Sequence, residues 1–204
     1  MKQFKKSVSL LIVLAIAGMV SAQKYGLEAA YVSSTTNNDD AVAGIQIGPV
    51  GEVQLTGPLS FQYGIKYQLL LNSQDHILGT TVYSGHFVQV PLRLKANFPM
   101  SNELSIFAFG GPNIDFGLDE RYKTTTPFGG SEVITNVYPY KIDSNDDGAY
   151  DYSRFNLQLG LGAGVQYHNL TLKVGYDWGM LDLNRLDDSE IHRNQLTLSV
   201  GYLL

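Results

Sequence analysis

The stretch HFVQVPLRLKAN, residues 86–97, alternates apolar and polar side chains along its whole length. One face carries Val88, Val90, Leu92, Leu94 and Ala96, and the other carries Gln89, Pro91, Arg93, Lys95 and Asn97. A period of two places successive side chains on opposite faces of a β-strand. The stretch therefore predicts a strand with one apolar face and one polar, partly charged face.

The same alternation recurs in seven further segments. These are residues 26–32, 42–55, 60–71, 104–118, 155–167, 170–180 and 196–204. The connections between the eight segments alternate between long and short, as in outer-membrane barrels, whose periplasmic turns are short and whose outside loops are longer. We therefore predict an all-β fold: an eight-stranded antiparallel up-and-down transmembrane β-barrel, formed as one domain by residues 23–204.

The first 22 residues are predicted to be a signal peptide. Lys2, Lys5 and Lys6 precede an apolar run, residues 8–20, and Val20-Ser21-Ala22 is a small-residue cleavage sequence. A retained membrane anchor is the alternative, which the shortness of the apolar run disfavours. We expect an exported mature chain that begins at Gln23 and resides in the cell outer membrane.

Charge and cysteine content exclude several classes of partner and scaffold. The chain has 14 basic and 19 acidic residues, and loss of the three leader lysines changes the net charge from −5 to −8 (11 minus 19). A surplus of acids disfavours nucleic acid as a partner. Without cysteine there is no disulfide framework and no N-terminal lipid-carrying cysteine.

A soluble barrel with apolar residues inside is the alternative to a membrane barrel. The polar face of the predicted strands carries ten glycines, which suit a crowded interior: Gly48, Gly64, Gly111, Gly117, Gly160, Gly162, Gly164, Gly175, Gly179 and Gly201. Aromatic residues gather near both ends of the apolar face, as they do at the two interfaces of a membrane barrel. We therefore expect the apolar face to meet lipid and the polar face to line the lumen.

The polar face carries as many acids as bases. They are Glu28, Glu52, Asp115 and Asp177 against Lys66, Arg93, Lys95 and Lys173. An unpaired buried charge is costly, so such a balance favours a narrow interior. Eight strands leave a lumen just wide enough to be filled by side chains. We predict a salt-bridged network of these eight residues, packed with Gln and Asn, instead of a wide pore.

Pro91 is the irregular position of the opening stretch. Proline donates no ladder hydrogen bond, and a closed sheet in lipid has no edge at which that loss is harmless. We predict a bulge or a lumen donor near Pro91, with Arg93 and Gln89 as the candidate donors.

Four segments together resemble a known family. VQVPLRLKANFP, Gly110-Gly111-Pro112, FNLQLGLGAGVQY and LTLSVGYLL resemble strands of the PorT-type outer-membrane β-barrel proteins of Bacteroidetes. The resemblance spans most of residues 25–204, but the chain ends in Leu204 where many outer-membrane proteins end in an aromatic residue. It implies an outer-membrane barrel, and some members of that family are associated with protein secretion or gliding machinery.

The segment 143–154 holds the one candidate metal site, and no other cofactor is expected. Asp143, Asn145, Asp147 and Asp151 have the oxygen spacing of a calcium loop, with Gly148 at the turn. However, position twelve is Arg154 instead of Glu, and no helices flank the loop. A solvated turn without metal is the alternative.

The residues favour a non-enzymatic barrel whose outside loops contact an envelope or extracellular partner. The predicted loop 117–152 is too long for a mere connector, and it contains anchor residues of the kind that interfaces use: Tyr122, Phe128, Tyr138, Tyr140, Tyr150 and Tyr152. A narrow channel or carrier for a small solute is the alternative. An enzyme at the rim would have to combine His86 with Ser84 or Ser153 and is disfavoured.

Overall fold

The computed structural model describes residues 23–37, 41–76, 79–128, 131–144, 150–186 and 190–204. The predicted signal peptide lies outside these residues. The strands are β1 (Gln23–Thr36), β2 (Val42–Gln54), β3 (Leu59–Gly64), β4 (Lys66–His76), β5 (Gly79–Pro99), β6 (Leu104–Phe128), β7 (Ser131–Val137), β8 (Phe155–Tyr167), β9 (Leu170–Gly179) and β10 (Arg193–Leu203). A short 3₁₀ helix, η1 (Pro139–Lys141), follows β7.

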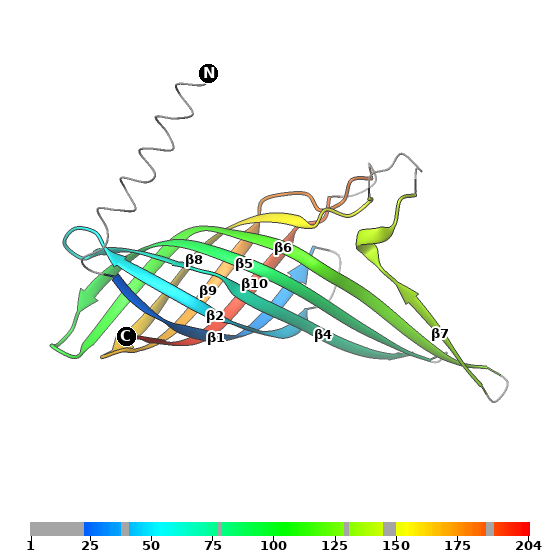
Figure 1. The fold of residues 1–204 in the computed structure, drawn as a ribbon, viewed down its shortest axis with the longest axis horizontal. Coiled ribbons are helices and arrows are strands. Elements are labelled where there is room, and N and C mark those ends of the chain that lie inside the picture. Colours follow the sequence, from blue (N-terminus) through cyan, green and yellow to red (C-terminus); the bar gives the residue numbers. More distant parts are fainter. Residues whose placement is uncertain (1–22, 38–40, 77–78, 129–130, 145–149, 187–189) are drawn as a thin grey trace, which may run out of the picture.

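The strands form one antiparallel ring (Figure 1). β3 and β4 are two parts of a single wall strand that is interrupted at Ile65, and β7 adds to β6 outside the ring. The ring is therefore β1, β2, β3 with β4, β5, β6, β8, β9 and β10. It closes where β1 pairs with β10, from Gly26 opposite Leu203 to Thr36 opposite Arg193. The predicted eight-stranded up-and-down barrel is confirmed.

The two faces of the wall are inverted relative to a water-soluble protein. Leu27 is 63% exposed on the outside while the next residue, Glu28, is 3% exposed inside. Leu94 and Lys95 repeat the contrast at 49% and 1%. An outward apolar band around a polar interior is the pattern of a transmembrane barrel. Among the described residues, no helix is long and apolar enough to cross a membrane.

Several strands are longer than the sequence predicts. Residues 72–82, expected as a loop, belong to β4 and β5, which pair as far as His76 opposite Gly79. The expected loop 117–152 begins as strand: β6 runs to Phe128 and turns back into β7. The outer parts of β4, β5, β6 and β7 thus form a sheet that extends far beyond the rest of the ring (Figure 1). The strands of this protruding sheet do not alternate cleanly between apolar and polar residues, because neither face of the sheet lies within the apolar band of the barrel.

The wall is irregular around Pro91, as predicted. The pairing of β5 with β6 is present at Pro91 opposite Asn113 and resumes at Leu94 opposite Gly110. On the other side of β5, the break between β3 and β4 falls at Ile65. The Arg93 guanidinium donates to the carbonyl oxygen of Gly111, whose φ of +147° suits glycine. A lumen side chain thus satisfies a backbone acceptor where the ladder is open.

Candidate functional site

All eight charged residues that the sequence assigns to the lumen are buried inside the barrel. Glu28 of β1 lies between Lys66 of β4 and Lys173 of β9 and forms an ion pair with each. Lys173 also donates to Gln62 at 2.8 Å. One carboxylate between two ammonium groups leaves this level of the lumen with one surplus positive charge.

A second group lies toward the end of the barrel that holds the short turns. Lys95 Nζ is 2.9 Å from Glu52 Oε2 and 3.1 Å from Gln166 Oε1, and it lies 4.2 Å above the ring centre of Phe107. Ser60 Oγ donates to the other Glu52 oxygen at 2.8 Å. Both oxygens of Glu52 and the ammonium group of Lys95 therefore have partners on other strands, which is what a buried ion pair requires.

Arg93 links opposite walls of the barrel. Its guanidinium donates to Asp177 of β9 and to the backbone of Gly111 in β6. Arginine suits this position because its planar fork of donors can serve two acceptors at once. The contact joins residues that are 84 positions apart in the chain.

A layer of buried amide side chains lies between Arg93 and the outer end of the barrel. It is made by Gln46, Gln68, Gln89, Asn113, Gln158 and Gln195, each at most 3% exposed. Gln89 donates to Gln195 at 3.0 Å, and Asn113 donates to Gln158 at 2.8 Å. Because amides both donate and accept, one layer of them cross-links six strands without adding charge.

Two phenylalanines complete the filling, and glycines make room for them. A Cβ atom placed on Gly162 would lie 2.3 Å from the Phe109 ring, and one on Gly164 would lie 2.5 Å from the Phe107 ring. A Cβ on Gly160 would lie 2.0 Å from Asp177 Oδ1. The glycines of β8 are therefore the space into which side chains from β6 and β9 fit.

The remaining free space at mid-barrel is small. The cavity lined by Arg93, Phe109 and Asp177 has a volume of about 40 Å³. That is room for a few water molecules.

The outermost charge cluster contains two residues that the sequence did not assign to the lumen. Arg193 Nη2 is 3.2 Å from Glu120 Oε1, and Arg193 Nη1 is 3.8 Å from Asp115 Oδ2. Tyr83 also donates to Glu120 Oε1. Glu120 was missed because β6 carries one extra residue, Leu118, between Gly117, which lies opposite Phe87 of β5, and Asp119, which lies opposite His86. The extra residue turns Glu120 inward where the alternation from Asp115 would point it outward.

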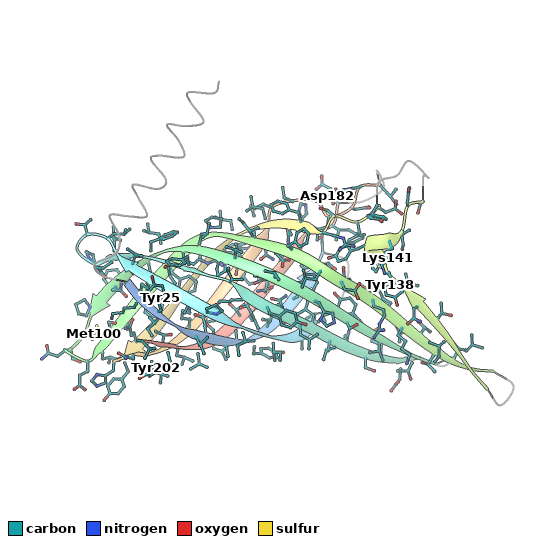
Figure 2. The ribbon with its side chains drawn as sticks, viewed as in Figure 1. Tyr25, Met100, Tyr138, Lys141, Asp182 and Tyr202 are labelled. Carbon is teal, nitrogen blue, oxygen red and sulfur yellow. The ribbon has the colours of Figure 1, made fainter. Side chains whose placement is uncertain are left out.

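The chain after β7 covers the outer mouth. Tyr140 of η1 is 2% exposed, and a Cβ on Gly117 would lie 2.2 Å from its hydroxyl oxygen. Burial raises the pKa of Tyr140 above its ordinary value. Figure 2 shows Tyr138, Lys141 and Asp182 at this end of the barrel, and Tyr25, Met100 and Tyr202 at the other.

Hydrogen bonds to the Asp182 carboxylate stabilise the connection between β9 and β10. The backbone N–H groups of Ile191 and Asn184 donate to this carboxylate at 2.8 and 2.9 Å and hold the pKa of Asp182 below its ordinary value. The buried side chain of Leu183 follows, and Leu183 O accepts from Ser153 N at 2.9 Å. These contacts bring two loops together over the mouth.

A second, larger cavity lies beneath these loops. Its volume is about 400 Å³. Glu120, Arg193, Tyr83 and Leu70 line it on the barrel side, and Ile142, Asp151 and Leu186 belong to the covering loops. We refer to it as the vestibule.

The candidate calcium residues are only partly described. Asn145 and Asp147 lie outside the described residues. Asp151 is 8% exposed and accepts from the backbone N–H and the hydroxyl of Ser144, at 3.1 and 2.6 Å. In the part of the chain that the structure describes, no group of three or more Asp, Glu, His or Cys side chains surrounds a metal position. Calcium binding stays a prediction.

The described histidine side chains contact residues other than serine. His86 Nδ1 contacts the Tyr67 hydroxyl on the outer surface, while His168 and His192 lie 3.4 and 3.3 Å from Glu103 and Glu190. Ser153 Oγ donates to the backbone of Phe155 at 3.0 Å. No hydrogen bond joins a serine to a histidine within the described segments.

Comparison with known proteins gives a family and a set of similar folds. The model of the outer membrane protein beta-barrel domain family matches residues 16–185. The sequence matches no curated protein. The outer membrane enzyme PagL has a TM-score of 0.50 at 12% identity, over 86% of this chain and 98% of that one.

Two other solved structures have a similar fold. Neisserial surface protein A has a TM-score of 0.48 at 14% identity, over 89% of this chain and 97% of that one. Ail, the attachment invasion locus protein of Yersinia pestis, has a TM-score of 0.41 at 11% identity, with coverage of 89% and 97%. At these identities the likeness concerns the fold alone. The finer resemblance to PorT-type proteins stays a prediction.

Proposed function

The chain belongs to the outer membrane protein beta-barrel domain family, and on that premise we propose that it is a non-conducting, non-enzymatic barrel that binds a protein partner. The protruding outer parts of β4, β5, β6 and β7 would form the binding surface. The partner would be an envelope or extracellular protein, and a secretion-related role accords with the resemblance to PorT-type barrels. Residues 1–22 would direct export, which an N-terminus at Gln23 in the mature protein would verify.

The observation that carries the proposal is the free edge of β7. Within the described residues, β7 pairs with β6 alone. Proteins usually protect such edges with proline, charge or a bulge, because unpaired N–H and C=O groups accept a further strand. Residues 133–137, Val-Ile-Thr-Asn-Val, contain no charge and no proline, and Val133 and Ile134 are 50% and 51% exposed. The edge is therefore suited to strand addition by a partner.

The filled lumen supports the non-conducting part of the proposal. The five buried acids and five buried bases, counting Glu120 and Arg193 with the eight predicted residues, lie across the path between the two ends. The mid-barrel cavity of about 40 Å³ is too small for a hydrated ion to pass without displacing them. The non-enzymatic part accords with the contacts of the described histidines, which are to Tyr67, Glu103 and Glu190.

The test removes one edge donor from β7 without altering its pairing to β6. Phe128 and Ser131 close the hairpin, so the N–H of Ile134 points away from β6. Ile134→Pro deletes that donor, and Ile134→Thr is the matched control that keeps it. A photo-crosslinker at Thr135 in intact cells should capture a partner in the wild type and in Ile134→Thr, and lose it in Ile134→Pro. Identical capture in all three would contradict strand addition.

A further inference from the structure

The vestibule contains a buried carboxylate oxygen without a partner. Glu120 is 4% exposed. Its Oε1 accepts from Tyr83 and Arg193, whereas its Oε2 has no hydrogen-bond partner. A buried acceptor without a donor is costly, so this oxygen is a position at which a ligand's donor would gain binding energy.

The charge around the vestibule is unbalanced. At its floor, the single guanidinium of Arg193 serves the two carboxylates of Asp115 and Glu120. Asp151 adds a third carboxylate to the wall, and no described cation forms an ion pair with it. The cluster therefore has a surplus of negative charge, which a bound cation would neutralise.

The rest of the lining indicates an organic cation in preference to a metal ion. Leu70, Ile142 and Leu186 provide apolar surface, and the rings of Tyr83 and Tyr122 pack with centroids 4.9 Å apart. Tyrosine rings attract ammonium groups through their negative faces. A volume of about 400 Å³ accommodates a molecule of one ring and a short chain.

We propose that the vestibule binds a small amphiphilic primary amine in its protonated form, with the ammonium group donating to Glu120 Oε2 and the apolar part against Leu70, Ile142 and Leu186. This site is independent of partner binding at β7. Its ligand enters from the outer face of the membrane, because the packed lumen closes the vestibule from the other side.

The test compares a charged probe with its neutral counterpart. 2-Phenylethylammonium and 2-phenylethanol have nearly the same shape, and only the first carries a charge. Titration calorimetry on the full barrel in nanodiscs should give saturable binding of the amine and binding of the alcohol that is at least about tenfold weaker. Equal affinities, or no binding of the amine, would overturn the proposal.

Two variants locate the site. Glu120→Gln should weaken amine binding at least about tenfold, because the ammonium group loses its charged acceptor. Glu103→Gln, an equal charge change at the opposite end of the barrel, should leave it unchanged. Leu186→Trp fills the vestibule without touching the charge cluster and should abolish binding even if Glu120→Gln does not fold. Undiminished binding in Leu186→Trp would place the amine elsewhere and overturn the proposal.

Discussion

At the scale of single residues, the lumen depends on ion pairs that lipid-embedded walls keep out of water. Arg93 and Asp177 are 6% and 4% exposed, and each is the other's ionic partner across the barrel. Breaking a buried pair by removing one member is far more damaging than removing both, because the remaining charge stays buried.

We therefore expect Asp177→Asn to lower the free energy of unfolding by about 3–5 kcal/mol. The double variant Asp177→Asn, Arg93→Met should regain most of that loss. Urea unfolding in lipid vesicles, followed through the fluorescence of Trp178, measures both. The control Glu190→Gln also removes one negative charge, but from an exposed side chain, and should change the free energy of unfolding by less than about 0.5 kcal/mol. A double variant as unstable as the single one would refute this pairing energy.

Gly162 tests the space reserved for Phe109. A Cβ at this position would lie 2.3 Å from the Phe109 ring and 2.4 Å from the backbone oxygen of Val174. The backbone contact cannot be relieved by a change of rotamer, so Gly162→Ala should destabilise the barrel by about 1–3 kcal/mol. Ala163→Val, which adds volume to the outward face of the same strand, serves as the control. Equal unfolding midpoints for the two variants would show that the glycine is not needed for packing.

Residue-level prediction from sequence works where the period of two is uninterrupted. The alternation places Glu28, Lys95 and Asp177 on the inner face, and the structure buries all three. The alternation fails at Glu120, beyond the bulge in β6. One extra residue in a strand reverses which face of the wall each later side chain points to. The position of a bulge depends on the partner strand and is not visible in a single strand's pattern.

At the scale of elements, the barrel wall and the protruding sheet are held by different contacts. The tip of the β6–β7 hairpin pairs only with itself beyond Thr125, which lies opposite Thr80 of β5. Each wall strand, in contrast, pairs with a neighbouring strand on both of its sides. The tip is therefore expected to be dispensable for folding.

Deletion of residues 125–134, with Thr124 and Thr135 joined by an Asn-Gly turn, should leave the barrel folded. Asn-Gly supplies the turn geometry that a two-residue hairpin prefers. Heat-modifiable mobility on gels and the urea midpoint should match the wild type, while crosslinked capture of the partner should be lost. A variant that no longer folds would show that the sheet contributes to barrel assembly.

The extent of the outer strands was not predictable from alternation. Residues 72–82 and 119–128 are mostly polar and do not alternate regularly, so the pattern by which lipid distinguishes inside from outside is missing there. Pairing between neighbouring strands extends β4, β5 and β6 into this region all the same. Strand ends within the apolar band, such as those of β8 and its turn at His168, agree with the sequence.

At the scale of the whole molecule, ring closure converts a polar strand face into a filled interior. We expect no stable conductance steps from the purified protein in planar bilayers, because buried charged and amide side chains occupy the lumen and the mid-barrel cavity measures only about 40 Å³. A wide porin measured in the same bilayers provides the positive control. Reproducible large steps from homogeneous protein would contradict the filled lumen and favour the channel alternative.

The sequence alone determined that this chain forms a barrel, how many wall strands it has, and which residues face inward wherever the alternation is uninterrupted. These follow from a local period of two and from the inversion of apolar and polar faces, which each strand carries independently of the others. Only the tertiary structure decided which charges meet and that Glu120 and Arg193 end beneath the outer loops. Those outcomes depend on the stagger between strands when the ring closes, which joins residues as distant as Arg93 and Asp177 and is a property of all eight strands together.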